Sequence, residues 1–361
     1  EKGKEVYYGA AGMADGETGR GMQRDTVVQI FSMTKPVTGV ALMMLYEEGR
    51  FDLDDPLAQY APEFANVRVY AGEDENGDAV YEAPRRPITI RDITRHTAGF
   101  ATGADPGPAG DAYRAAPPLQ FDEPLAGFAR RLAVLPLASH PGQRWSYGDS
   151  VDVQAYLVER LSGVPFEQFL QQRIFDPLRM TETGYRLRDG QRERIARLYE
   201  RGDGGLAPVP DERMLYLNTH PHALTPGGFG LVSTLDDYMR FARMLLREGE
   251  LDGARLLKPE TVRLMATDQL PDEITDRSWL PSKGEVGFGI DFAVRVAPPA
   301  GPEENTGAVG EYFWDGAAST LFWVDPANDL AAVFFTQHMP FNGRLHKRIR
   351  DAVYGRSVAA N

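Results

Sequence analysis

The sequence predicts an α+β fold, in which a split domain built from both chain ends encloses a mostly helical insertion. Stretches typical of strands occur near the N-terminus and in the last third of the chain: 6–12, 26–28, 286–297, 320–325 and 330–337. Apolar residues recur at helical spacing in the middle, most clearly over 150–161 and 165–175. We therefore expect one domain from 1–65 plus 225–361 and a mostly helical subdomain over 66–224.

The most informative helical stretch begins near Ser32. Apolar residues cover more than one helical face over 37–45, so this helix is predicted to lie centrally in the fold. Pro36 is tolerated in the first turn, because the N–H groups there have no partner within the helix. Gly49 is expected to end the helix.

Turn and cap residues predict the remaining elements. We expect a hairpin over 67–90 with its turn at 75–78, and helices over these ranges: 91–97, 235–246 and 344–353. Residues 101–124 are rich in Gly, Pro and Ala without a periodic segment, so they are predicted to be a loop that is disordered or borders a binding site. Residues 186–214 are charged and predicted to be irregular.

Composition narrows the possible partners. The net charge of −13 and pI near 5.0 argue against nucleic acid or an anionic membrane as principal partner. The absence of cysteine excludes disulfides, thiol catalysis and cysteine-bound metals. No apolar run is long enough for a transmembrane helix. The chain starts at Glu1 within a predicted strand context, so we expect its natural N-terminus to be missing. A cytoplasmic location is favoured, although the sequence does not exclude that a signal peptide precedes Glu1. The oligomeric state is not predicted.

Ser32 and Lys35 form the first pattern with chemical content. On a helix they lie on one face, one turn apart, near the positive end of the helix dipole. A hydroxyl beside an amine is a candidate nucleophile, and a buried lysine, unlike arginine, can lose its proton. The pattern is short, and a helix-capping serine followed by a surface lysine would look the same.

Two distant segments add to this pattern: Trp145-Ser146-Tyr147-Gly148-Asp149 and Tyr312-Phe313-Trp314-Asp315-Gly316-Ala317. The set resembles the serine hydrolases of the β-lactamase/penicillin-binding-protein fold, in which Ser-x-x-Lys carries the nucleophile. It is most similar to the class C β-lactamase branch and within it to the family VIII carboxylesterases. Supporting stretches run through nearly the whole chain: 87–99, 174–184 and 227–234. The resemblance implies an antiparallel sheet flanked by helices. The active site is expected in the cleft between the domain that carries Ser32 and the third motif and the helical subdomain that carries Tyr147.

The resemblance also implies roles for residues. Ser32 would form an acyl-enzyme, and Lys35 and Tyr147 would share the role of general base, because an ammonium favours a neighbouring phenolate. The backbone N–H groups of Ser32 and Ala317 would hold the oxyanion. No cofactor and no metal are implied.

Departures from the β-lactamase pattern bear on the substrate. Trp314 stands where β-lactamases have a cationic or histidine residue, which favours neutral esters over anionic β-lactams. Asp149 replaces an asparagine and would hold Lys35 protonated. Trp314, Asp149, Asp315 and Gly316 are expected to line the substrate pocket.

Other interpretations remain open at this point. A class C-type β-lactamase, a D-amino-acid peptidase or amidase, and an acyltransferase share the acyl-enzyme step, and a fold used only for binding is a further alternative. The G-x-S-x-G turn of α/β-hydrolases is absent. His220 and His222 could form half of a metal site, whereas His96 and Asp152 are interpreted as structural. The preferred prediction is a cofactor-free serine carboxylesterase acting on small-molecule esters of short-to-medium acyl chains.

Overall fold

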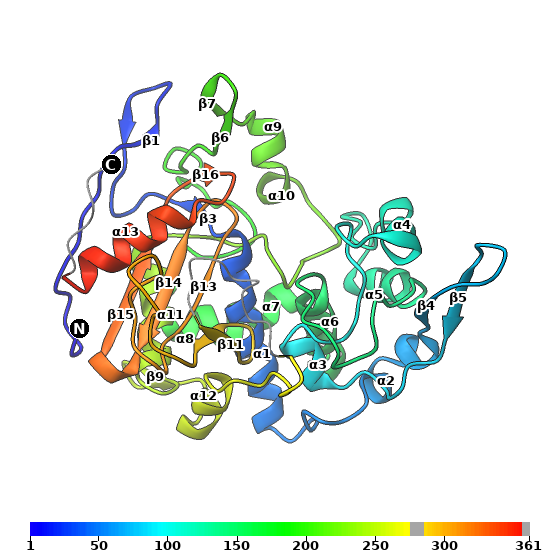
Figure 1. The fold of residues 1–361 in the computed structure, drawn as a ribbon. Coiled ribbons are helices and arrows are strands. Elements are labelled where there is room, and N and C mark those ends of the chain that lie inside the picture. Colours follow the sequence, from blue (N-terminus) through cyan, green and yellow to red (C-terminus); the bar gives the residue numbers. More distant parts are fainter. Residues whose placement is uncertain (275–284, 356–361) are drawn as a thin grey trace.

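A central antiparallel sheet of five strands organises the computed structural model, which describes residues 1–274 and 285–355 (Figure 1). Each strand pairs with the next one along the chain, so the sheet needs no crossover connection. The bounds are: β11 Val286–Phe288, β12 Ala293–Arg295, β13 Tyr312–Asp315, β14 Leu321–Asp325 and β15 Leu330–Phe334. The expected α+β class with an antiparallel sheet is confirmed.

Helices cover this sheet and fill the middle of the chain. In chain order they are: α1 Thr34–Glu47, α2 Leu57–Tyr60, α3 Ile90–Thr94, α4 Gly107–Ala115, α5 Leu125–Ala133, α6 Ser150–Ser162, α7 Phe166–Leu170, α8 Asp176–Leu178, α9 Asp211–Met214, α10 Tyr216–Thr219, α11 Leu235–Leu246, α12 Pro259–Met265 and α13 Gly343–Val353. Small sheets join the following strands: β1 (Met13–Asp15) with β2 (Arg20–Gly21), β3 (Val28–Gln29) with β8 (Val232–Ser233), β4 (Val69–Glu73) with β5 (Ala79–Glu82), β9 (Glu250–Leu251) with β10 (Ala254–Arg255), and β16 (His338–Met339) with β6 (Tyr199–Gly202) and β7 (Gly205–Pro208).

The two faces of the main sheet are covered by different helices (Figure 1). Phe322 points towards α11, where the ring of Tyr238 lies 5.2 Å away. Its strand neighbours point the other way, because side chains alternate along a strand. The Arg350 guanidinium of α13 lies over the rings of Phe313 and Trp323 at 4.8 and 4.7 Å. The sheet is therefore buried on both sides.

A buried ionic cluster fixes α13 to the sheet. Glu311 accepts hydrogen bonds from Arg295 Nε at 3.0 Å and from Arg350 Nη1 at 2.8 Å, and all three side chains are fully buried. One carboxylate thus holds two guanidinium groups, so its loss would leave both buried without this shared partner.

Helix α1 runs through the core, as predicted. Every residue from Thr34 to Leu45 is buried, because apolar side chains cover more than one of its faces. A three-residue 3-10 turn, Phe31–Met33, precedes it, so Ser32 lies in this turn and not in the α-helix itself. Gly49 follows the helix with a φ of +69°, the conformation expected of a terminating glycine.

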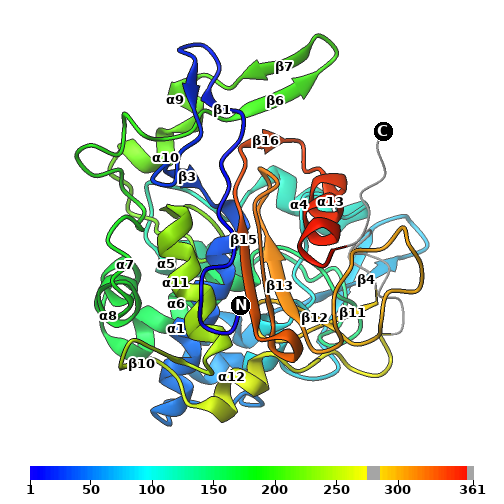
Figure 2. The ribbon, with the colours of Figure 1, turned by 90° about the vertical axis from the view of Figure 1, so that its left-hand side faces the viewer.

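Several expectations from the sequence need correction. The predicted strand over 6–12 is wrong, since no strand forms before β1 in the described chain. The predicted loop 101–124 contains helix α4; only Ala109 and Gly110 of that helix are buried, so it presents no apolar stripe to recognise. The range 186–214 contains the β6–β7 hairpin, which lies beside the β1–β2 hairpin (Figure 2). Tyr199 of β6 accepts a hydrogen bond there from the backbone of Gly16.

Helix α11 begins and ends where the sequence predicted, the hairpin β4–β5 forms within its predicted range, and helix α13 begins one residue before the predicted start and ends at the predicted residue. Helix α6, from the middle of the chain, packs along α1 (Figure 1). The division into 1–65 plus 225–361 and 66–224 stays a prediction. Over residues 1–274 and 285–355, no helix is both long and apolar enough to cross a membrane.

Candidate active site

The Ser32–Lys35 pair forms as its spacing predicts. Lys35 Nζ lies 3.2 Å from Ser32 Oγ and donates a hydrogen bond to the carbonyl oxygen of Gly228 at 2.8 Å. One turn further along α1, Thr38 Oγ1 donates to the carbonyl oxygen of Gly227 at 2.7 Å. Ser32 is partly exposed and Lys35 is buried. The hydroxyl is therefore open to a substrate, while the amine is fixed behind it.

Tyr147 brings an aromatic ring to the same amine. Its ring centre lies 4.7 Å from Lys35 Nζ, and its ring stacks on Trp145 with centroids 5.6 Å apart and planes inclined by 11°. The ring of Trp314 lies 5.4 Å away. Tyr147 nevertheless remains 37% exposed. Its neighbours thus orient the ring without enclosing it.

His96 also packs against Tyr147, although the sequence indicated only a structural role for His96. Its ring centroid lies 4.9 Å from that of Tyr147 and 5.3 Å from that of Phe288, and its carbonyl accepts a hydrogen bond from Ser146 N–H. Neither ring nitrogen has a hydrogen-bond partner among the described residues. Burial, helped by the charge of Lys35, lowers the pKa of His96 well below its usual value. His96 is therefore a neutral ring packed against Tyr147.

Trp314 forms an apolar wall beside Tyr147, in the position expected from the third motif. It is 2% exposed, and the ring of Phe288 meets it edge-on at 5.3 Å. Phe288 was not singled out in the sequence, because it reaches the site only through the pairing of β11, β12 and β13.

Gly316 brings the end of β13 against the segment that precedes Ser32. A Cβ at Gly316 would lie 2.5 Å from the carbonyl oxygen of Ile30 and 2.3 Å from Thr320 Oγ1. Only glycine allows so close an approach. The next residue, Ala317, is partly exposed, and its N–H makes no hydrogen bond within residues 1–274 and 285–355. This N–H is thus free to stabilise an anion near Ser32.

Two buried acids lie at the start of α6. Asp149 accepts a hydrogen bond from the Tyr113 hydroxyl at 2.7 Å, and Asp152 Oδ1 accepts one from the Gly228 N–H at 3.1 Å. Burial raises the pKa of Asp149, while the Tyr113 hydrogen bond and the Lys35 charge oppose this rise. Burial and the neighbouring Asp149 raise the pKa of Asp152 to about 7, again opposed by Lys35. The structure thus pairs Asp149 with Tyr113, a partner that the sequence did not reveal.

Asp315 does not lie on the side of β13 that carries Trp314. Consecutive strand residues point to opposite faces, so Asp315 faces α13. Its Oδ2 lies 3.9 Å from Nδ1 of His346 in that helix. The expectation that Asp315 lines the same pocket as Trp314 is corrected by this geometry.

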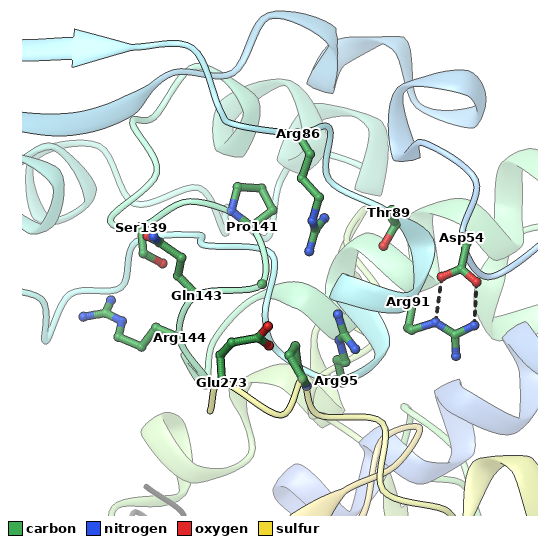
Figure 3. A pocket seen from close by; sticks show the side chains of 12 residues that line it. Asp54, Arg86, Thr89, Arg91, Arg95, Ser139, Pro141, Gln143, Arg144 and Glu273 are labelled. Carbon is green, nitrogen blue, oxygen red and sulfur yellow. Dashed lines mark hydrogen bonds and ion pairs between the residues drawn. The ribbon is translucent and has the colours of Figure 1, made fainter. Parts of the chain in front are cut away.

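A cavity of about 1120 Å³ lies elsewhere, and Figure 3 labels four arginine side chains among the residues that line it. Neither Ser32, Lys35 nor Tyr147 belongs to its wall. Each guanidinium has a carboxylate partner: Arg86 and Arg95 share Asp92, Arg91 pairs with Asp54, and Arg144 pairs with Asp105. Asp92 belongs to α3 and Arg144 precedes Trp145, so these pairs lie just before the residues His96 and Tyr147 in the chain.

His220 and His222 do not form half of a metal site. Their rings lie 4.8 and 4.9 Å from that of Tyr216, on which they pack. In the described part of the chain, no three His, Cys, Asp or Glu side chains are arranged to hold a metal ion.

A helix-covered antiparallel sheet with a Ser-x-x-Lys pair at the start of its central helix is the arrangement of serine hydrolases with the β-lactamase/transpeptidase fold. The chain belongs to the Beta-lactamase family, whose family model matches residues 1–355.

Relatives and solved structures extend this result. An uncharacterised protein of Mycobacterium tuberculosis is 37% identical over 94% of this chain and 84% of its own length. Esterase EstB of Burkholderia gladioli is 29% identical over 98% of this chain and 88% of its own. Among solved structures, simvastatin synthase LovD from Aspergillus terreus matches with a TM-score of 0.78 at 25% identity, covering 94% of this chain and 87% of that one. EstCE1, described as a hydrolase with promiscuous acyltransferase activity, matches with 0.75 at 25% identity, covering 97% and 90%.

Proposed function

We propose that this protein is a carboxylesterase that cleaves short-to-medium-chain esters through an acyl-enzyme on Ser32. The observation that carries the proposal is the double contact of the Lys35 amine, with the Ser32 hydroxyl and with the Gly228 carbonyl. A buried amine held in this way lies next to a hydroxyl that a substrate can reach, where it can help to activate that hydroxyl as a nucleophile.

In the acylation step, Ser32 Oγ attacks the ester carbonyl carbon and gives its proton to the base formed by Tyr147 and Lys35. The carbonyl oxygen becomes an oxyanion, held by the N–H groups of Ser32 and Ala317. The intermediate then breaks its bond to the leaving alkoxide, which takes up a proton from Tyr147. The products of this step are an alcohol and an acyl ester on Ser32.

In the deacylation step, water replaces the alcohol. Tyr147 takes a proton from this water, the hydroxide attacks the acyl carbon, and Ser32 leaves with a returned proton. The acid product is released, and the neutral hydroxyl of Ser32 is restored.

The apolar wall favours esters over β-lactams. Trp314 offers no charge to the carboxylate of a β-lactam, whereas its ring suits a neutral acyl group. The similarity to Esterase EstB supports the same preference. A class C-type β-lactamase and a D-amino-acid peptidase or amidase are the alternatives, since both would use the same acyl-enzyme.

Acyl transfer to an alcohol is a second candidate, favoured by the similarity to simvastatin synthase and to EstCE1. An acceptor alcohol would then take the place of water in the deacylation step, with the same residues acting on it.

The test compares kcat/KM for p-nitrophenyl butyrate with kcat/KM for the chromogenic cephalosporin nitrocefin, with Ser32→Ala as the control. We expect ester turnover far above nitrocefin turnover, and none above background in Ser32→Ala. Equal or faster nitrocefin turnover would refute the esterase assignment. Addition of a primary alcohol tests the second candidate, because an acyltransferase would form the new ester at the expense of the free acid.

A further inference from the structure

Two buried acidic residues that take no part in the proposed reaction lie against α1. Asp152 belongs to α6 and is 2% exposed, whereas Asp291 lies between β11 and β12 and is fully buried. Both are close enough to Lys35 to be influenced by its charge. A buried charged pair needs good geometry and further hydrogen bonds, so the contacts of each acid decide whether it can balance the lysine.

Asp152 is connected to Lys35 through the backbone of Gly228. Asp152 Oδ1 accepts the Gly228 N–H at 3.1 Å, and the Gly228 carbonyl accepts from Lys35 Nζ at 2.8 Å. A Cβ at Gly228 would lie 3.0 Å from Asp152 Oδ2 and 3.3 Å from Lys35 Nζ. The carboxylate of Asp152 and the amine of Lys35 therefore contact the same residue, one through its N–H and the other through its carbonyl. Asp152 orients the carbonyl that holds the amine, and its second oxygen lies on the side of the amine.

Asp291 has different surroundings. Gln154 Nε2 donates to Asp291 Oδ1 at 2.9 Å and to the Ile93 carbonyl at 3.0 Å. Both of these neighbours are acceptors, so they fix which end of the Gln154 amide is nitrogen. Asp291 Oδ2 lies against α1 at Gly39, where a Cβ would approach it to 2.5 Å.

Two side-chain oxygens in this arrangement make no hydrogen bond to the described residues. Asp291 Oδ2 and Gln154 Oε1 are both buried and without a hydrogen-bond partner among the described residues. Two unpaired acceptors on adjacent side chains would each carry the cost of desolvation. A proton on Asp291 Oδ2, donated to Gln154 Oε1, would satisfy both oxygens in an acid–amide pair. An ionised Asp291 would satisfy neither.

We propose that these two acids have different roles: Asp152 is the ionisable residue that positions and balances Lys35, and Asp291 is a neutral carboxylic acid paired with Gln154. The proposal deepens the proposed function and rests on it where Lys35 and Tyr147 act as the base.

The groups around Asp291 agree with this division. From α1 it faces Gly39 and the charge of Lys35, and from α6 it faces Gln154. Its own N–H donates to the carbonyl of Thr94, the last residue of α3. Burial raises the pKa of Asp291 well above its usual value, and the Gln154 hydrogen bond and the Lys35 charge do not reverse this. For Asp152, in contrast, burial and the charge of Asp149 raise the pKa to about 7, while the charge of Lys35 and the Gly228 N–H oppose the rise.

The consequence for catalysis is that the active site becomes more active as Asp152 loses its proton. When Asp152 is ionised, its carboxylate accepts the Gly228 N–H, and its negative charge lies beside the amine that the Gly228 carbonyl holds next to Ser32. We therefore expect the rate to rise with pH through about 7, the pKa of Asp152.

The test compares two matched variants, Asp152→Asn and Asp291→Asn, by their pH profiles of kcat/KM for p-nitrophenyl butyrate. Asparagine at 152 still accepts the Gly228 N–H but carries no charge, so we expect the rise near pH 7 to disappear. Asparagine at 291 can accept from Gln154 Nε2 and donate to Gln154 Oε1, so we expect the profile and the rate to stay unchanged. A rise that persists in Asp152→Asn, or that shifts in Asp291→Asn, would overturn the proposal.

A folding measurement tests the neutral acid without using activity. A carboxyl that keeps its proton in the folded protein and releases it in the unfolded chain makes stability fall as pH rises above the unfolded pKa. The folding equilibrium constant of the parent should therefore fall about tenfold per pH unit relative to Asp291→Asn between pH 5 and 8. If the ratio of the two folding equilibrium constants did not change with pH, the proposal that Asp291 is protonated in the folded protein would be refuted.

Infrared spectra of the parent at pH 8 provide a second measurement if Asp291→Asn does not fold. We expect the carbonyl band of a protonated carboxylic acid, retained in Asp149→Asn and in Asp152→Asn. Its absence from the parent would refute the proposal. If no ester were hydrolysed at all, the proposed function would fail, while the folding and infrared measurements would still decide the state of Asp291.

Discussion

Substitution of Gly316 by alanine should impair catalysis by displacing the nucleophile. The added Cβ would lie 2.5 Å from the Ile30 carbonyl oxygen, whereas ordinary contacts begin at 3.4 Å. The backbone must therefore yield by roughly 1 Å, a displacement that can cost about 100-fold in rate when it reaches reacting groups. Ile30 lies only two residues before Ser32, so the shift is passed directly to the hydroxyl. We expect kcat to fall by about 10- to 100-fold, with about 1–3 kcal/mol lost from stability through overpacking.

The assay is kcat for p-nitrophenyl butyrate, together with urea unfolding to confirm that the variant is folded. Gly301→Ala is the matched control, since a Cβ at Gly301 would meet no atom within 4 Å. A folded Gly316→Ala protein with kcat within twofold of the parent would show that the contact between β13 and the Ile30 segment does not position Ser32.

Two further predictions concern stability. Glu311→Ala should cost about 3–5 kcal/mol in urea unfolding, because it leaves two buried guanidinium groups without their shared carboxylate; a loss no larger than that of the exposed Glu303→Ala would contradict this. Asp92 should stabilise the fold at neutral pH: burial alone would raise its pKa, but the hydrogen bonds from Arg86 and Thr89 and the charge of Arg95 outweigh burial and lower it. Its contribution is present above the unfolded pKa and lost as pH falls through the lower folded value. The stability gap between the parent and Asp92→Asn should therefore narrow between pH 5 and pH 3, and a constant gap would refute the interpretation.

Local sequence patterns predicted the parts of the site that are close together in the chain. Ser32 lies in the 3-10 turn that leads into α1, and Lys35 follows three residues later in the first turn of α1, so their contact follows from local helical geometry. Helix α11 was predicted to the residue, because Thr234 caps it and its apolar residues form a clear stripe.

Contacts between distant segments could not be predicted in the same way. The carbonyl of Gly228 reaches Lys35 across 193 residues, and Gln154 meets Asp291 across 137. Nothing in either local sequence marks such a partner. Helix α4 was missed for a different reason: it is too little buried to show an apolar period.

The side of the sheet to which Asp315 points could have been predicted. Trp314 and Asp315 are neighbours on one strand, and neighbours on a strand point to opposite faces. Treating the motif as a unit places both residues in the pocket, whereas the alternation along the strand places Asp315 on the opposite face.

The central claim is that Ser32 carries an acyl group during turnover. The most direct measurement is the intact-protein mass after brief incubation with p-nitrophenyl butyrate and acid quench, followed by peptide mapping of the adduct. We predict a single butyryl adduct on the peptide that contains Ser32 in the parent protein and no adduct in Ser32→Ala. An adduct on another residue, or ester hydrolysis that continues undiminished in Ser32→Ala, would contradict the account.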